Sequence, residues 1–186
     1  VRIENIKINT KFFPSKFVIK QGEFRFEGSQ LTFKDVKARY IRNVFMFDGN
    51  VSNYLNYALK ENENLKGTIN FTTNKVNIDD FMAFNSGATS TNSVSSEEGV
   101  ILLPKNVDLQ IKGTAKEVLF KDIVLQNFNG DLALKAGNLT LQNTKFNMIG
   151  SEFTMNGNYI PLNARKAKFN MDIKANNFDI QRAYHE

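Results

Sequence analysis

One stretch of this 186-residue chain occurs twice at a constant spacing. Residues 22–51 align with residues 130–159 without a gap, at an offset of 108. A second block, which starts at Asn70 and Asn170, aligns at an offset of 100. Two copies of one supersecondary unit are typical of repeat architectures, in which stacked units share a continuous core. The identical pairs of the first block are Gly22/Gly130, Leu31/Leu139, Thr32/Thr140, Lys37/Lys145, Ile41/Ile149, Phe45/Phe153, Gly49/Gly157 and Asn50/Asn158.

Within each copy, apolar residues come in pairs that are two positions apart. Because side chains at i and i+2 lie on one face of a strand, these pairs predict β-strands with one apolar face. Polar or glycine-containing segments separate the pairs and predict the tight turns of an antiparallel meander. The predicted turns are Gly28-Ser29-Gln30, Lys34-Asp35, Arg42-Asn43, Ala136-Gly137-Asn138, Gln142-Asn143 and Gly150-Ser151.

Each copy ends with a longer alternating strand, predicted at residues 67–73 and 167–174. Asp79 and Asp179 follow these strands at positions where an N-cap would begin a short helical turn. A weaker helical pattern covers residues 54–63. The segment 85–100 is rich in Ser, Thr and Asn and predicts a flexible linker. We therefore divide the chain into a first β repeat (1–84), the linker (85–100) and a second β repeat (101–186), together one continuous unit cut from a longer protein.

The composition agrees with an all-β chain. Phe is abundant (17 residues), Cys is absent, and the net charge of +5 comes from lysines scattered along the chain. We expect an antiparallel meander in two similar repeats, forming a curled, groove-like or open-barrel sheet with short helical turns. Without cysteine there is neither a disulfide framework nor a thiolate metal site. Scattered lysines without interleaved aromatic residues do not favour nucleic-acid binding.

The apolar face of such a sheet must be covered, and the sequence offers only short helical turns for this purpose. Three solutions stay open: a sandwich, a closed barrel, or a trough whose interior is covered by a bound apolar ligand. Catalysis is not expected, because the single histidine, His185, is next to the last residue. A catalytic triad or a histidine metal site therefore has no base or ligand in the body of the chain. We predict no catalytic residues, no metal site, no cofactor and no enzymatic activity.

Several segments resemble the C-terminal region of the AsmA-like proteins of Gram-negative bacteria, over about residues 65–186. The resemblance lies in patterns of apolar, Gly and Asp positions rather than in a chemical signature. The segments that carry it are Leu65-Lys66-Gly67-Thr68-Ile69-Asn70-Phe71, Val76-Asn77-Ile78-Asp79-Asp80-Phe81, Leu103-Pro104-Lys105-Asn106-Val107-Asp108-Leu109, Leu119-Phe120-Lys121-Asp122-Ile123, Gly130-Asp131-Leu132-Ala133-Leu134, Gly137-Asn138-Leu139-Thr140-Leu141 and Phe153-Thr154-Met155-Asn156-Gly157-Asn158-Tyr159.

The resemblance implies a periplasmic protein that an N-terminal helix, absent here, holds in the inner membrane. It further implies a β-groove that binds or conducts phospholipid or other acyl chains in outer-membrane biogenesis, with other envelope proteins as possible partners and no nucleic acid. The alternative is a structural or adhesive β module with a filled core that binds protein or carbohydrate. The residues expected to line a groove are Leu132, Leu134, Leu139, Leu141, Phe146, Met148, Phe153, Met155, Phe169, Met171, Phe24, Phe26, Leu31, Phe33, Phe45 and Phe47.

Overall fold

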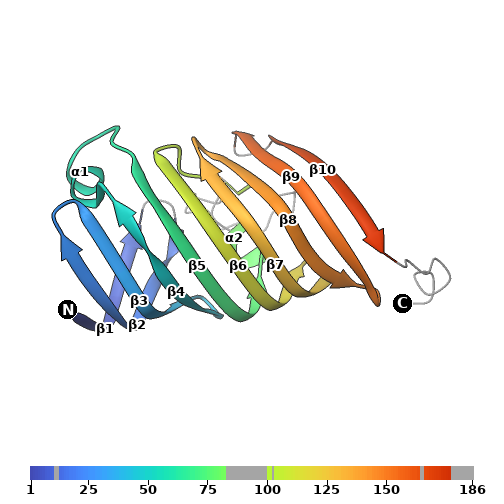
Figure 1. The fold of residues 1–186 in the computed structure, drawn as a ribbon, viewed down its shortest axis with the longest axis horizontal. Helices are drawn as coiled ribbons and strands as arrows, with labels where there is room; N and C mark the ends of the chain where they lie inside the picture. The colour runs from blue at the N-terminus through green and yellow to red at the C-terminus, as the bar shows by residue number, and fades with distance from the viewer. Residues whose placement is uncertain (11–12, 83–99, 102, 164–165, 177–186) are drawn as a thin grey trace, which may run out of the picture.

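The computed structural model describes residues 1–10, 13–82, 100–101, 103–163 and 166–176. They form one sheet of ten strands, which lie side by side in the order in which they occur in the chain (Figure 1). The first strand does not pair with the last, so the sheet is curled but not closed into a barrel. The expected mainly-β fold with a curled sheet is confirmed.

Two short helices accompany the strands. Helix α1 (Tyr54–Leu59) connects β4 to β5, and helix α2 (Asp79–Met82) follows β5 and lies behind the sheet in Figure 1. The strands are β1 (Arg2–Thr10), β2 (Phe13–Glu27), β3 (Gln30–Tyr40), β4 (Asn43–Ser52), β5 (Leu65–Asn77), β6 (Val107–Phe120), β7 (Ile123–Lys135), β8 (Asn138–Met148), β9 (Ser151–Asn163) and β10 (Lys166–Asn176).

One pair of neighbouring strands departs from the predicted antiparallel meander. Strands β5 and β6 are parallel, with Leu65 opposite Val107 and Ile69 opposite Ile111, whereas the other neighbours are antiparallel. A parallel pair needs a connection that returns along the sheet to its starting end. The sequence pattern did not reveal this, because side chains alternate in the same way in parallel and antiparallel strands.

Two of the predicted turns are β-bulges inside long strands. Asp35 in β3 and Asn143 in β8 have positive φ angles of 51° and 47°, and the register to the next strand shifts at both positions. Each bulge is fixed in the same way, because the N–H of Asp35 donates to Asp48 Oδ1 and the N–H of Asn143 donates to Asn156 Oδ1, both at 2.8 Å. The turn predictions at Lys34-Asp35 and Gln142-Asn143 were therefore wrong. The two bulges, each with its side-chain acceptor in the next strand, occur 108 residues apart and thus follow the sequence repeat.

The other predicted turns and both helical segments occur in the structure. Chain reversals lie at residues 28–29, 41–42, 136–137 and 149–150. At the start of α2, however, Asn77 Oδ1 accepts the N–H of Asp79 at 2.9 Å, whereas the Asp79 carboxylate accepts the N–H of Lys121 at 3.0 Å. Asp79 is thus not the cap; it joins α2 to the turn between β6 and β7. Its counterpart Asp179 and most of the expected linker (85–99) lie outside the described residues, and the predicted repeat boundaries stay a prediction.

The core consists of two clusters on the face of the sheet that carries the helices. The first cluster is centred on Tyr40, Phe45 and Val118, and Phe81 of α2 packs against it. The second is centred on Val51, Val107 and Leu109, with Tyr54 and Tyr57 of α1 packed against it. Burying a large apolar side chain contributes about 1.5–3 kcal/mol, so each short helix is held by its aromatic residues rather than by its own hydrogen bonds.

Next to each bulge, one side chain of β3 or β8 packs directly on a glycine of the preceding strand. A Cβ atom added to Gly22 would lie 2.7 Å from Val36 Cγ2, and one added to Gly130 would lie 2.7 Å from Thr144 Oγ1. Val36 and Thr144 correspond at the 108-residue offset, yet only Thr144 brings a hydroxyl group into this packing. That hydroxyl is fully buried and has no hydrogen-bond partner among the described residues.

We expect Thr144→Val to stabilise the fold by about 1 kcal/mol, because it replaces an unsatisfied buried hydroxyl with a methyl group of similar shape. The measurement is urea unfolding of the variant and the parent chain. Thr140→Val in the same strand is the control: the Thr140 hydroxyl lies 3.0 Å from Asn158 Oδ1 on the exposed face, and its removal should give no gain. A loss of stability in Thr144→Val would contradict the packing described above.

Candidate functional site

The strand register places the sixteen expected lining residues on one side of the sheet, which we call the apolar face. Phe26 lies opposite Leu31, Leu134 lies opposite Leu139, and Phe146 lies opposite Phe153. Directly opposed residues point to the same face, so the pairing extends this face from strand to strand. At the far edge, Phe169 and Met171 lie opposite Tyr159 and Gly157.

Burial along the apolar face differs between its middle and its two margins. Phe45, Phe146 and Phe153 are at most 7% exposed, and the rings of Phe146 and Phe153 stack at 5.5 Å with an interplanar angle of 8°. By contrast, Phe26 of β2 is 48% exposed and Met171 of β10 is 51% exposed. The middle of this face is therefore packed as a core, whereas both margins present large apolar side chains.

Three segments cover parts of the apolar face in the part of the chain that the structure describes. Helices α1 and α2 pack against the two core clusters, whose residues come from strands β2 to β7. On the other side, Ile101 lies against β9: its N–H donates to Tyr159 Oη at 2.9 Å, and Tyr159 Oη donates to the Ile101 carbonyl oxygen at 3.1 Å. Val100 beside it is 7% exposed. The segment that leads into β6 is thus held against β9 by the two hydrogen bonds between Tyr159 and Ile101, which we call the Tyr159 tie.

We expect Tyr159→Phe to release this tie at a cost of about 1 kcal/mol, since it removes both hydrogen bonds but keeps the ring. Hydrogen exchange at the Ile101 amide should accelerate while amides of β8 stay protected. Burial raises the pKa of Tyr159. Because the unfolded chain then ionises first, the stability that comes from burying the neutral phenol is present below about pH 10 and decreases above it, and the Phe variant lacks this pH dependence at position 159. Unchanged exchange at Ile101 would show that the tie is not formed in solution.

Several residues that belong to the apolar face were not among the predicted lining residues. Ile69 lies opposite Ile111, Phe71 lies opposite Gly113, and Ile173 lies opposite Met155. The same alternation that identified the other positions would have identified these. No signal in the sequence pairs Tyr159 with Ile101, because the contact joins residues 58 positions apart.

The acidic residues that the structure describes do not gather into a metal site. The described part of the chain contains no group of three or more His, Cys, Asp or Glu residues that could hold a metal ion. The carboxylates of Asp79 and Asp80 serve structural bonds, since Asp80 accepts hydrogen bonds from both Arg42 and the amide of the buried Asn43. His185 lies outside the described residues. None of the helices in the described part is long and apolar enough to cross a membrane.

Comparison with protein-family models, with curated protein sequences and with solved structures finds no match to the chain. The functional inference below therefore depends on the geometry of the apolar face and on the resemblance of residues 65–186.

Proposed function

We propose that this chain is a periplasmic β-groove segment, similar to AsmA-like proteins, that binds or conducts lipid acyl chains along its apolar face. The observation that carries the proposal is the exposure of apolar side chains at the margin of this face. Phe169, Met171 and Ile173 of the edge strand β10 are 49%, 51% and 46% exposed and follow one another on one side of the strand. An exposed apolar strip continuous with a packed apolar core is a typical contact surface for an apolar ligand.

The energetics favour such a ligand. Burying one methylene group gains about 0.8 kcal/mol, so a 16-carbon chain gains on the order of 10 kcal/mol when it is fully buried, and correspondingly less when only one side of it contacts the strip, before ordering costs. In the described strands, no cluster of charged side chains lies among the apolar residues of this face to hold a headgroup in one place. This arrangement suits a surface along which a lipid moves better than a deep pocket in which it stays.

A filled β module is the second candidate function. The packing of α1 and α2 on the core clusters of β2 to β7 supports it, because there the apolar face is covered by the chain's own residues. Such a module would bind protein or carbohydrate at its polar surface. The two candidates differ in what the β8–β10 side of the apolar face contacts.

Met171→Asp is expected to weaken the binding of a fluorescent fatty-acid probe by at least about tenfold, because it places a charge in the proposed acyl contact. Met171 is half exposed on an edge strand, so the variant should fold. Asn170→Asp is the matched control: it adds the same charge to the same strand, but Asn170 lies opposite Asn158 on the other face. Equal probe binding by both variants and the parent would exclude the β10 strip as the lipid contact.

The direct test is native mass spectrometry with lipid extraction, on the chain purified from a bacterial envelope without detergent. Phospholipid in near-stoichiometric amounts is the expected result. A lipid-free chain that also fails to bind the fatty-acid probe would favour the filled module.

A further inference from the structure

The side of the sheet opposite the apolar face, which we call the polar face, carries a row of residues that combines three lysines with no carboxylate. The register connects Lys37, Met46, Thr72, Thr114, Asn129, Lys145, Thr154 and Lys174 in eight successive strands, from β3 to β10. We call this the basic row. With neighbouring strands about 4.8 Å apart, Lys37 and Lys145 are separated by roughly 24 Å across the sheet, and Lys174 by roughly 10 Å more.

The lysines of the basic row are not neutralised within the described residues. Two lysines elsewhere on this face pair with carboxylates, Lys112 with Asp131 and Lys135 with Asp108. No ion pair involves Lys37, Lys145 or Lys174 in the described part of the chain, and the same holds for Lys116, which lies two residues from Thr114 in β6. These four exposed ammonium groups can therefore pair with an anionic ligand.

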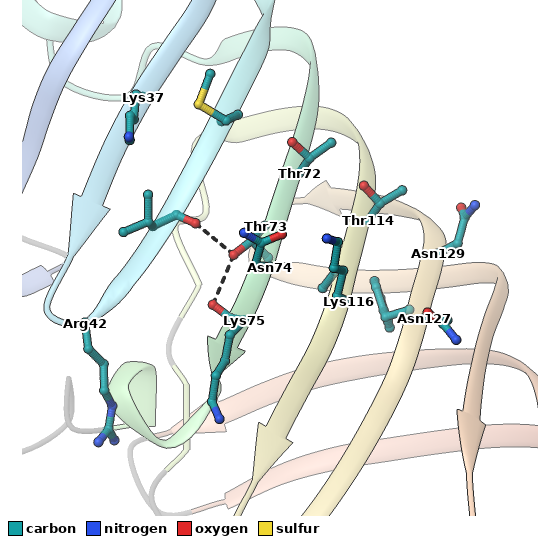
Figure 2. A pocket seen from close by; sticks show the side chains of 14 residues that line it. Lys37, Arg42, Thr72, Thr73, Asn74, Lys75, Thr114, Lys116, Asn127 and Asn129 are labelled. Atoms are coloured by element: carbon teal, nitrogen blue, oxygen red, sulfur yellow. Dashed lines mark hydrogen bonds between the residues drawn. The ribbon is translucent and has the colours of Figure 1, made fainter. Parts of the chain in front are cut away.

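A depression of about 730 Å³ hollows the polar face at the first half of this row (Figure 2). Its lining includes Lys37, Arg42, Lys75 and Lys116, together with the hydroxyl and amide groups of threonine and asparagine, and contains no Asp or Glu. Arg42 and Lys75 already have partners in Asp80 and Glu117, which leaves Lys37 and Lys116 as the unpaired cations of the depression.

The depression is built into the sheet rather than formed by loose surface side chains. Pairing of β4 with β5 ends at Met46 and Thr72. Beyond this point a hydrogen bond from the Thr73 side chain takes the place of the backbone hydrogen bonds between β4 and β5. The Thr73 hydroxyl lies 2.8 Å from the Val44 carbonyl oxygen and 3.0 Å from the Lys75 carbonyl oxygen; dashed lines mark both interactions in Figure 2. A left-handed residue in β7, Asn127 with φ 52°, interrupts the pairing on the other side.

The shape of the charge distribution limits the partner. Two residues along the strands, roughly 7 Å away, a parallel row carries Asp48, Asp131 and Asp172, with Lys112 between the first two, and is acidic on balance. A flat anionic membrane or a wide nucleic-acid duplex placed on the basic row would also cover these carboxylates. Single-stranded nucleic acid prefers aromatic side chains for stacking, and the basic row has none. A narrow, linear polyanion without bases can follow the basic row without covering the carboxylates and needs no aromatic side chains for stacking.

We propose that the basic row and its depression bind a linear acidic polysaccharide, laid across the strands on the face opposite the apolar one. The ammonium groups pair with its carboxylates, whereas Thr72, Thr114, Asn129 and Thr154 hydrogen-bond its hydroxyl groups between them. Met46 gives the sugar rings an apolar contact. This site is separate from the proposed lipid contact and does not depend on it.

Isothermal titration of the full 186-residue chain with a hexasaccharide of galacturonic acid tests the proposal, with uncharged maltohexaose as the ligand control. Binding of the acidic hexasaccharide is expected at about 50 mM NaCl and should be lost at about 500 mM NaCl, because exposed charges are screened. The triple variant Lys37→Gln/Lys116→Gln/Lys145→Gln should bind at least about tenfold more weakly. All three side chains are exposed, so its unfolding midpoint should match that of the parent.

Lys66→Gln/Lys112→Gln/Lys135→Gln is the matched variant, since it removes the same charge from the same face outside the row. It should bind within about twofold of the parent. Equal weakening by both triple variants would overturn the proposal in favour of attraction to net charge. Absence of binding at low salt, or stronger binding of oligo-dT or of anionic phospholipid vesicles than of the hexasaccharide, would overturn it as well.

Discussion

Phe153→Asp is expected to unfold the chain. Phe153 is 7% exposed, stacks on Phe146 and lies opposite it in the β8–β9 ladder. A carboxylate at this position would have no cationic partner among the described residues of the apolar face, and an unpaired buried charge costs several kcal/mol. Domains of this size are stable by only about 5–15 kcal/mol. Far-UV circular dichroism during urea unfolding should show a transition at a much lower urea concentration than in the parent, or no cooperative transition.

Thr154→Asp is the control for this variant, because it adds the same charge one residue later on the polar face, in the row that contains Lys145 and Lys174. Its free energy of unfolding should lie within about 1 kcal/mol of that of the parent. A folded Phe153→Asp chain with the parent's midpoint would mean that the apolar face is open to water even at β8–β9. With Met171→Asp, this variant maps where the packed core ends and the proposed lipid contact begins.

The face to which each residue belongs could be predicted from the sequence, because side-chain alternation depends on local geometry alone. The spacing of Leu132 and Leu134, or of Phe24 and Phe26, is enough to place them together. Whether such a residue is buried depends on what else lies over it. Phe45 and Phe26 have the same pattern, yet one is 7% exposed under α2 and the other is 48% exposed near the sheet margin.

The bulges show a second limit of local reasoning. Asp35 and Asn143 carry the residue types that favour a left-handed backbone, and this conformation serves both a tight turn and a bulge. The choice is made by the neighbouring strand, through the side chains of Asp48 and Asn156, which accept the freed N–H groups. Those residues are 13 positions away in each copy, beyond the reach of a turn motif.

The basic row is invisible in the sequence for a related reason. Its lysines are separated by many residues in the chain and by neutral residues in the sheet, so the sequence shows only scattered charge. The register that aligns Lys37 with Lys145 and Lys174 includes the parallel β5–β6 pair, which the alternation could not reveal. A shift of register by two residues at that junction could align the second half of the row with the acidic row instead.

Gly67→Ala is expected to destabilise the fold by about 3 kcal/mol, the upper part of the range for overpacking. A Cβ at position 67 would lie 2.2 Å from the carbonyl oxygen of Asn50 and 2.8 Å from Val51 Cγ1. The nearest atom belongs to the backbone of β4, so a rotamer change cannot relieve the contact and the two strands must separate. Val51 is a core residue beneath α1, and the strain therefore reaches the second core cluster.

Urea unfolding of Gly67→Ala measures this cost, and Gly28→Asn provides the comparison. Gly28 has a φ of 57° in the β2–β3 turn and nothing within 4 Å of its Cβ position, so asparagine, which tolerates this backbone conformation, should cost less than about 1 kcal/mol. The double variant Gly67→Ala/Val51→Ala distinguishes the contact with the Asn50 carbonyl oxygen from the contact with the Val51 side chain. If the backbone of β4 sets the limit, the smaller side chain at position 51 will not restore stability; full restoration would show that only the valine methyl group stands in the way.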